Sequence, residues 1–223
     1  MTATAPETGS PGPGSQPPGR RERKKQRTRE ALVDAAFTLF AEKGFDATTV
    51  EEIADAVDVS SRTFFRYFSS KEDVALTFQE EQIRAVVAAL AERPPDEPIM
   101  TALRRTVVEI ARACEAGELG FDPDRFECML TMTSESPALL AGSLEHAQKK
   151  QALLTEIVAG RMGLDLATDL RPHVVAAATS CAFQAAADVT RRLGGTFGTL
   201  SETVDQAFAI LESGLNEPAP PAE

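Results

Sequence analysis

The chain has 223 residues, of which 43% are hydrophobic and 26% are charged, and this length and composition suit one or two globular domains. No apolar run approaches the length needed to cross a bilayer, and the chain opens with a Pro-, Gly- and Ser-rich stretch instead of a signal peptide, so we expect neither a membrane protein nor a secreted one. The three cysteines, Cys114, Cys128 and Cys181, are odd in number and far apart, which favours reduced thiols in a cytoplasmic protein over a disulfide framework.

Charge is distributed unevenly along the chain, whose formal net charge is −11. Residues 20–72 carry 11 Lys or Arg and 10 Asp or Glu, whereas residues 73–223 carry 12 and 23. Within the first block the positive residues gather at Arg20, Arg21, Arg23, Lys24, Lys25 and Arg27. Because binding to a polyanion depends on the local field, this segment can attract DNA while the acidic remainder repels it.

The first predicted helix runs from about Thr28 to Lys43. Its apolar residues recur at helical spacing, and Gly44 follows it as the residue that adopts a positive φ most easily. A later helix is predicted to start where Ser69 and Glu72 form the pattern of a capping box.

Two short helices with a tight turn between them are predicted in the intervening segment. Thr49 with Glu52 is another capping box, so the first of these helices starts there. Asp58 tolerates the left-handed conformation that the turn needs, and Ser60 can cap the second helix. Two short helices around such a turn form a helix-turn-helix, whose second helix enters the major groove of DNA.

A set of residues in this segment matches the pattern of one known family: Leu32, Ala35, Ala36, Leu39, Phe40, Gly44, Ala47, Thr48, Thr49, Val50, Ile53, Ala54, Val59, Ser60, Thr63, Phe64, Tyr67, Phe68, Ser70, Lys71 and Glu72. Residues 28–75 therefore resemble the DNA-binding domain of the TetR family of transcriptional regulators. The chain departs from the family pattern at Asp58, where glycine is usual, and at Phe65, where tyrosine is usual. The resemblance implies a C-terminal helical domain that binds a ligand and forms a dimer.

The rest of the chain up to the C-terminal tail is also predicted to be helical, without an alternating strand pattern. Proline, glycine and N-cap signals place these helices at about residues 70–92, 98–117, 123–135, 137–162, 169–194 and 201–215. The expected fold class is all-α, with an N-terminal three-helix DNA-binding domain of the helix-turn-helix type. We expect a disordered arm, this domain, a ligand-binding and dimerisation domain and a disordered tail at 1–19, 20–73, 74–216 and 217–223.

Candidate DNA contacts lie on the predicted recognition helix and at two helix starts. Arg62 is placed where side chains reach base edges, and arginine pairs bidentately with guanine, although a phosphate contact or a solvated arginine is an alternative. The resemblance adds Ser61 and Phe65 as base contacts, with a role in the core as the alternative for Phe65. Arg66 belongs to the same set, and phosphate contacts are expected from Thr49, Thr63, Tyr67 and Lys71.

The predicted C-terminal domain should enclose a cavity for a small-molecule effector. Phenylalanine and methionine make an adaptable apolar wall, and a few polar groups can orient a ligand, although ordinary core packing is the alternative at each position. The expected lining is Phe121, Phe126, Met129, Met132, Cys181, Phe183 and Gln184. Residues 135–139 and 161–163 are in addition similar to regulators whose ligand is of the acyl-CoA type.

The last two predicted helices are candidates for a homodimer interface. The first is rich in alanine, so another helix can approach it closely, and the second has apolar residues at helical spacing. The expected interface residues are Ala178, Ala182, Ala185, Val204, Phe208, Leu211 and Leu215. The alternative is that both helices only close the core of their own subunit.

The predicted function is that of a ligand-responsive repressor that binds a palindromic operator on double-stranded DNA as a dimer. An activator, a regulator without a ligand, an architectural DNA-binding protein and an enzyme are the alternatives. The enzyme is disfavoured because the chain lacks HExxH, CxxC, P-loop and nucleophile-elbow motifs, so no catalytic residue is assigned. His146 has no cysteine or carboxylate nearby at ligand spacing, a solvated side chain is the default for both His146 and His173, and no metal or cofactor is expected.

Overall fold

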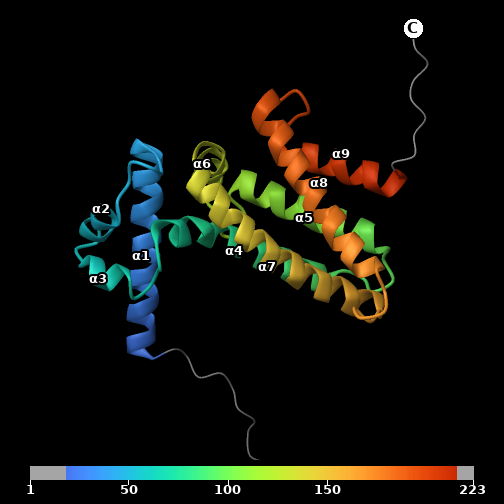
Figure 1. The fold of residues 1–223 in the computed structure, drawn as a ribbon, viewed down its shortest axis with the longest axis horizontal. Coiled ribbons are helices and arrows are strands. Elements are labelled where there is room, and N and C mark those ends of the chain that lie inside the picture. The colour runs from blue at the N-terminus through green and yellow to red at the C-terminus, as the bar shows by residue number, and fades with distance from the viewer. Residues whose placement is uncertain (1–18, 215–223) are drawn as a thin grey trace, which may run out of the picture.

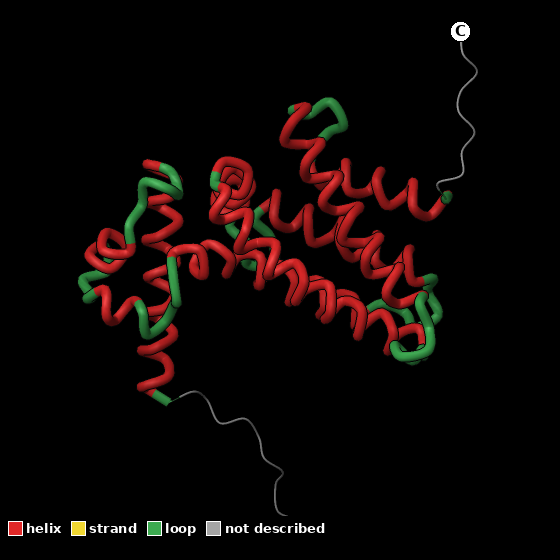
Figure 2. The backbone as a smooth tube through the Cα atoms, in the orientation of Figure 1, coloured by secondary structure: helices red, strands yellow, loops and turns green. Residues whose placement is uncertain are grey.

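The computed structural model describes the backbone of residues 19–214 and, apart from residues 134, 138 and 140–147, their side chains as well. Most of the predicted N-terminal arm, the predicted C-terminal tail and Leu215 lie outside this range. Within it the chain consists of helices joined by loops, with no strand (Figure 2), so the predicted all-α fold class is confirmed. None of the described helices is long and apolar enough to cross a membrane.

The longest helix of the N-terminal domain is α1 (Arg20–Lys43), and Gly44 ends it with a φ of 86°. It buries Leu32, Ala36 and Phe40 on one side. The helix begins about two turns before the predicted start at Thr28, because the basic stretch there consists mainly of strong helix formers. The basic residues are therefore part of a regular helix and not of an irregular arm.

Helices α2 (Val50–Asp55) and α3 (Ser61–Phe64) form the helix-turn-helix against α1 (Figure 1). Ile53 and Phe64 are completely buried and hold the two short helices on the core. Asp58 in the turn has a φ of 55°, as predicted. The Ser60 hydroxyl accepts a hydrogen bond from the backbone N–H of Thr63 at 3.2 Å, so Ser60 is the N-cap of α3.

Helix α4 (Lys71–Glu92) runs from the helix-turn-helix into the C-terminal domain and belongs to both (Figure 1). Its N-cap is Ser70, whose hydroxyl accepts from the N–H of Asp73 at 3.3 Å. The predicted capping pair Ser69 and Glu72 is therefore shifted by one residue, since Ser69 donates to the Asp73 carboxylate instead.

The C-terminal domain is a bundle in which α4 is joined by five further helices, α5 (Ile99–Ala116), α6 (Pro123–Glu135), α7 (Pro137–Met162), α8 (Arg171–Leu193) and α9 (Leu200–Ser213). Helix α5 packs along α9, while α8 contacts both α7 and α9. The centre of the bundle contains Leu103, Val158, Val204 and Phe208, each completely buried. On the surface, Arg104 of α5 bonds to Asp205 at 2.8 Å and to Glu212 at 2.6 Å, both on α9.

A second connection between the two domains runs through α6. Arg125 at its start forms an ion pair with Asp34 of α1, and its guanidinium lies 5.6 Å from the centroid of the Phe37 ring. After the end of α6, the Ser136 hydroxyl donates to the Asp46 carboxylate at 2.7 Å. The position of the DNA-binding domain therefore depends on α6 as well as on α4.

Candidate nucleic-acid interface and regulatory domain

The solvent-facing side of α3 and of the turn after it carries Arg62, Phe65 and Arg66, all exposed. Phe65 is 55% exposed and meets Phe64 only edge-on, with ring centroids 5.5 Å apart, so the core role considered for it does not apply. Phe64 points the other way and is completely buried. Phe64 therefore anchors the helix on the core, while Phe65 belongs to the exposed surface. Ser61 is partly buried.

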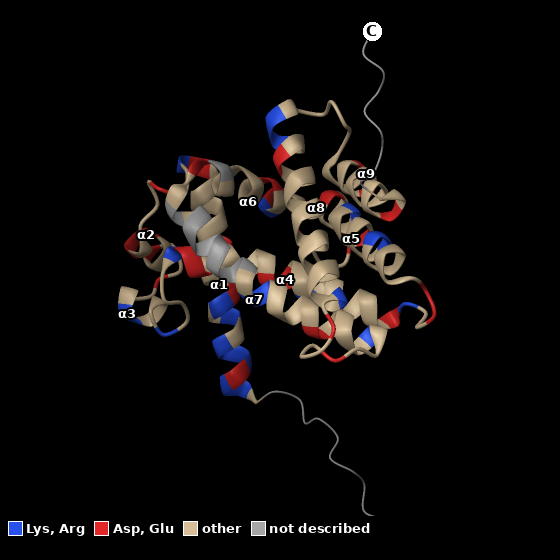
Figure 3. Cartoon of the chain, turned by 45° about the vertical axis from the view of Figure 1, so that its right-hand side comes forward, with Lys and Arg blue, Asp and Glu red and all other residues tan. Residues whose placement is uncertain are grey.

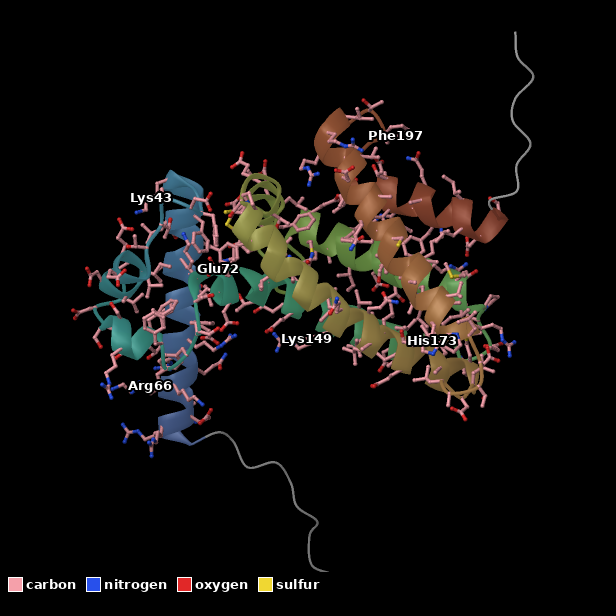
Figure 4. The ribbon with its side chains drawn as sticks, in the orientation of Figure 1. Lys43, Arg66, Glu72, Lys149, His173 and Phe197 are labelled. Carbon is pink, nitrogen blue, oxygen red and sulfur yellow. The ribbon has the colours of Figure 1, made fainter. Side chains whose placement is uncertain are left out.

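Arg66 and Tyr67 form a pair at the edge of this surface. The Arg66 guanidinium lies 5.3 Å from the centroid of the Tyr67 ring and donates a hydrogen bond to its phenol oxygen at 3.4 Å. This bond, opposed by burial, lowers the pKa of Tyr67. Figure 4 shows Arg66 on the side of the N-terminal domain that faces away from the C-terminal helices. Both side chains can therefore reach a phosphate that approaches from solvent.

The hydroxyls of Thr49 and Thr63 are already used inside the domain. Thr49 donates to the Glu52 carboxylate at 2.8 Å and accepts from the Glu52 N–H at 3.3 Å, so the predicted capping box is present. The ion pair with Lys43 and the bonds from Thr49 lower the pKa of Glu52 to about 2, so this carboxylate is charged at neutral pH. A phosphate at Thr49 would have to compete with it. The Thr63 hydroxyl is 3.1 Å from that of Ser60.

Lys71 has a different role from the predicted phosphate contact. Its ammonium donates to the backbone carbonyls of Phe45 at 2.8 Å, Asp46 at 3.2 Å and Thr48 at 2.9 Å, and lies 4.5 Å from the centroid of the Phe45 ring. All three donors are occupied, which contradicts a phosphate contact. Lys71 instead holds the loop between α1 and α2, and local sequence could not reveal this because the partners lie more than 20 residues away.

A second positive surface lies on the first two turns of α1. Figure 3 shows Lys and Arg gathered along this part of the helix. Their side chains are all exposed: Arg20, Arg21, Arg23, Lys24, Lys25 and Arg27. A helix that presents these charges to solvent supplies a local positive field in an otherwise acidic chain.

The predicted effector residues divide into two groups. Phe121, Phe126, Met129 and Met132 are buried, and Phe78 packs on the first two with ring centroids 5.8 and 6.0 Å apart, while Phe183 lies half-buried against the same core. Cys181 and Gln184 are exposed, so they do not line the interior. They occupy the face of α8 opposite to Ala182 and Ala186, whose side chains meet the core.

Three hydrogen bonds between interior helices escaped the sequence analysis. Lys150 of α7 donates to Gln79 of α4 at 2.7 Å. Ser180 of α8 donates to Gln151 at 2.8 Å, and Gln82 of α4 donates to the Cys114 sulfur of α5 at 3.4 Å. Polar residues interrupt the apolar faces of α4 and α7 at these positions, and that interruption is the signal that could have found them.

No group of acidic, histidine or cysteine side chains suited to a metal ion occurs in the described part of the chain.

The predicted dimer residues mostly face the core of their own subunit. Val204 and Phe208 are completely buried and Ala182 nearly so, which contradicts a direct contact with a partner. Ala178 and Leu211 are half-buried, and Ala185 is exposed. The reason is that α9 turns its apolar stripe toward α5 and α8.

An apolar surface exists instead on the outer face of α8 and beside it. Leu170 just before the helix is 72% exposed and Val174 is 55% exposed. Further along the same face, Ala177, Cys181 and Ala185 are also exposed, and on α9 Ile210 is 55% exposed.

Comparisons with known proteins agree with this architecture. The family described as bacterial regulatory proteins, tetR family, matches residues 32–77, and the one described as the MftR C-terminal domain matches residues 97–216. The HTH-type transcriptional regulator TcmR of Streptomyces glaucescens is 40% identical over 174 residues, 77% of each chain. The HTH-type transcriptional repressor KstR2 of Rhodococcus jostii (strain RHA1) is 48% identical over 50 residues, 22% of this chain and 24% of its own.

Two solved structures have the same fold at low sequence identity. The fatty acid degradation regulator FadR from Bacillus halodurans is 21% identical with a TM-score of 0.56, and the match covers 86% of this chain and 97% of that one. FadR from Bacillus subtilis in complex with stearoyl-CoA is 18% identical with a TM-score of 0.54, over 84% and 99% of the two chains. The family matches, together with the long alignment to TcmR, place this chain in the TetR family of bacterial transcriptional regulators.

Proposed function

We propose that this chain is a repressor that binds a palindromic operator as a homodimer and leaves it when a small effector enters the C-terminal domain. The observation that carries the proposal is the solvent-facing side of α3, where Arg62, Phe65 and Arg66 are exposed on a helix that Phe64 anchors. Arginine can read the major-groove edge of guanine, and an aromatic ring can contact the methyl group of thymine. This is the surface expected of a recognition helix.

The apolar face of α8 supports the dimer. It presents Leu170, Val174 and Ala177 to solvent, with Ile210 of α9 exposed as well, and contiguous exposed apolar residues usually mark an interaction surface. A two-fold axis through such a face would bury the same residues of both copies. The two recognition helices would then read half-sites about 34–36 Å apart, or a multiple of that spacing.

The packed phenylalanine and methionine side chains between α4 and α6 support an apolar or acyl-type effector. Methionine adapts to a ligand more readily than branched side chains do. We take α4 to have two positions, one in the operator-bound state and one in a state that cannot bind the operator. The proposed effector fits the C-terminal domain better when α4 is in the latter position, so effector binding shifts the population away from the operator-bound state. FadR of Bacillus subtilis, which shares the fold, was solved with stearoyl-CoA.

The test is a selection of operator sequences from random DNA with the full chain, followed by footprinting and transcription from a promoter that contains the selected site. We expect a short palindrome and reduced transcription. Val174→Glu places a charge on the outer face of α8 and should give a folded monomer with weak operator binding, whereas Glu156→Gln at an exposed position of α7 should change neither. Stimulated transcription would favour an activator, and uniform coverage of DNA an architectural protein.

A further inference from the structure

Lys150 is one of the cationic residues that bond between helices of the C-terminal domain. It lies partly buried on α7, and its ammonium donates to the amide oxygen of Gln79 on α4 at 2.7 Å. Like Arg161 of the same helix, which donates to the backbone carbonyls of Leu90 and Arg93 at 3.3 Å each, it places a formal charge between packed helices. Burying a charge is unfavourable unless an opposite charge accompanies it, so the position needs an explanation beyond packing.

The charge of Lys150 is only weakly compensated by its surroundings. No carboxylate among the described side chains lies within ion-pair distance of its ammonium, and its hydrogen-bond partner is a neutral amide. Burial lowers the pKa of Lys150 to about 8, against a smaller opposing effect of Glu80 on α4. An anion placed beside Lys150 would therefore supply a compensation that the described side chains do not.

The location of this lysine connects it to the DNA-binding domain. Gln79 lies about two turns after Lys71, and Lys71 begins α4 directly after the helix-turn-helix. The bond from Lys150 to Gln79 thus joins α7 to the helix whose displacement would move α3. An anion that takes over the donors of Lys150 would release Gln79 and allow α4 to shift relative to α7.

We propose that Lys150 is the residue that recognises the effector, and that the effector carries an anionic group at one end of an apolar chain. The inference rests on the proposed function, because it assumes that effector binding and operator release are linked. The anion can be a carboxylate or the phosphates of a coenzyme A thioester, since an ammonium binds both as a point charge.

The experiment compares three probes that share one chain length, namely dodecanoate, dodecanoyl-CoA and the uncharged dodecan-1-ol. Their affinities are measured by calorimetry on the full-length chain and on Lys150→Met, Lys150→Gln and Lys150→Arg. Lys149→Met is the matched control, because Lys149 is the exposed neighbour on the same helix. Melting temperature and operator affinity without probe show that each variant is folded, and Lys150→Gln replaces Lys150→Met if the latter does not fold.

We expect the wild type to bind at least one anionic probe more tightly than dodecan-1-ol and to release the operator when it does. Lys150→Met should lower the affinity for that anionic probe about tenfold or more, which is the usual effect of losing a charged hydrogen bond. The affinity for dodecan-1-ol should change by no more than about twofold. Lys150→Arg and Lys149→Met should retain the anionic preference. Which of the two anions is bound distinguishes a free acid from a thioester.

If Lys150→Met lowered the affinity for charged and uncharged probes equally, the proposal would be overturned, because Lys150 would then be a packing residue. An unchanged affinity for the anions would overturn it too. If the wild type binds the operator but neither anion, the inference fails while the proposed regulator stands. If the wild type binds no specific operator at all, the proposed function itself fails.

Discussion

The DNA-binding domain and the C-terminal domain obtain their functional surfaces in different ways. In the first, short local motifs decide which side chains face solvent: Ser60 caps α3, Asp58 makes the turn, and Arg62 and Phe65 are then exposed. In the second, the helices are equally regular, but the exposed face of each is decided by neighbours far away in sequence. Helices of similar sequence pattern can therefore carry an interface or a core, and only the packing distinguishes the two.

Phe208 is the sharpest test of that difference, because sequence analysis placed it in the dimer interface and the structure buries it completely. Phe208→Ala should lower the free energy of unfolding by about 3–5 kcal/mol, the usual result of opening a cavity in place of a buried phenylalanine. The measurement is chemical denaturation at a fixed protein concentration.

The matched control is Ile210→Ala, two residues away on the same helix and 55% exposed. It should change stability little at a given concentration but weaken the dimer in sedimentation. Should Phe208→Ala leave unfolding unaffected and only shift the monomer–dimer equilibrium, the core assignment would be wrong.

Sequence alone predicted the helices of this chain well, since capping boxes, prolines and glycines act locally, and the predicted DNA contacts Arg62, Phe65 and Arg66 are exposed. It failed where side-chain direction depends on tertiary contacts. Val204 was predicted to face a partner and Cys181 to face a ligand, yet the former is buried and the latter exposed. Periodicity identifies an apolar face, but it does not tell which neighbour covers that face.

Lys71 is an exception within the DNA-binding domain, because its role depends on contacts with residues that are distant in the sequence. Lys71→Met should destabilise that domain by about 1.5–3 kcal/mol, since the ammonium is bonded to three backbone carbonyls of the loop between α1 and α2. Thermal unfolding of the domain measures this. The slope of log affinity against log salt should stay unchanged in the folded variant, whereas removal of a lysine that binds a phosphate would flatten it by about 0.9.

Arg62 tests whether the local motif defines the reading surface. Arg62→Ala should weaken specific operator binding by about 1–3 kcal/mol and relax the preference at one base pair of each half-site, because alanine cannot form the bidentate hydrogen bonds to a base. Selection of operators with the variant measures both effects. Arg112→Ala, at an exposed position of α5, removes the same charge elsewhere and should leave the selected sequences as they are. Equal preferences before and after the change in Arg62 would assign it to the phosphates.

The smallest effect on operator binding is expected from changes to the basic residues in the first two turns of α1, which we expect to supply charge but no contact to a base. Arg23 and Arg27 are exposed one helical turn apart, and replacing both with glutamine keeps the helix while removing two charges. The salt slope of operator binding should fall by about 0.9 for each phosphate that the variant no longer neutralises, with base preferences unchanged. The same double change at Arg105 and Arg112 on α5 should leave the slope unaltered. Because the basic residues are held in a helix, the weakening should be uniform over operator sequences. A weakening confined to A·T-rich sites would instead show that they enter the minor groove, which requires this part of α1 to unwind on DNA.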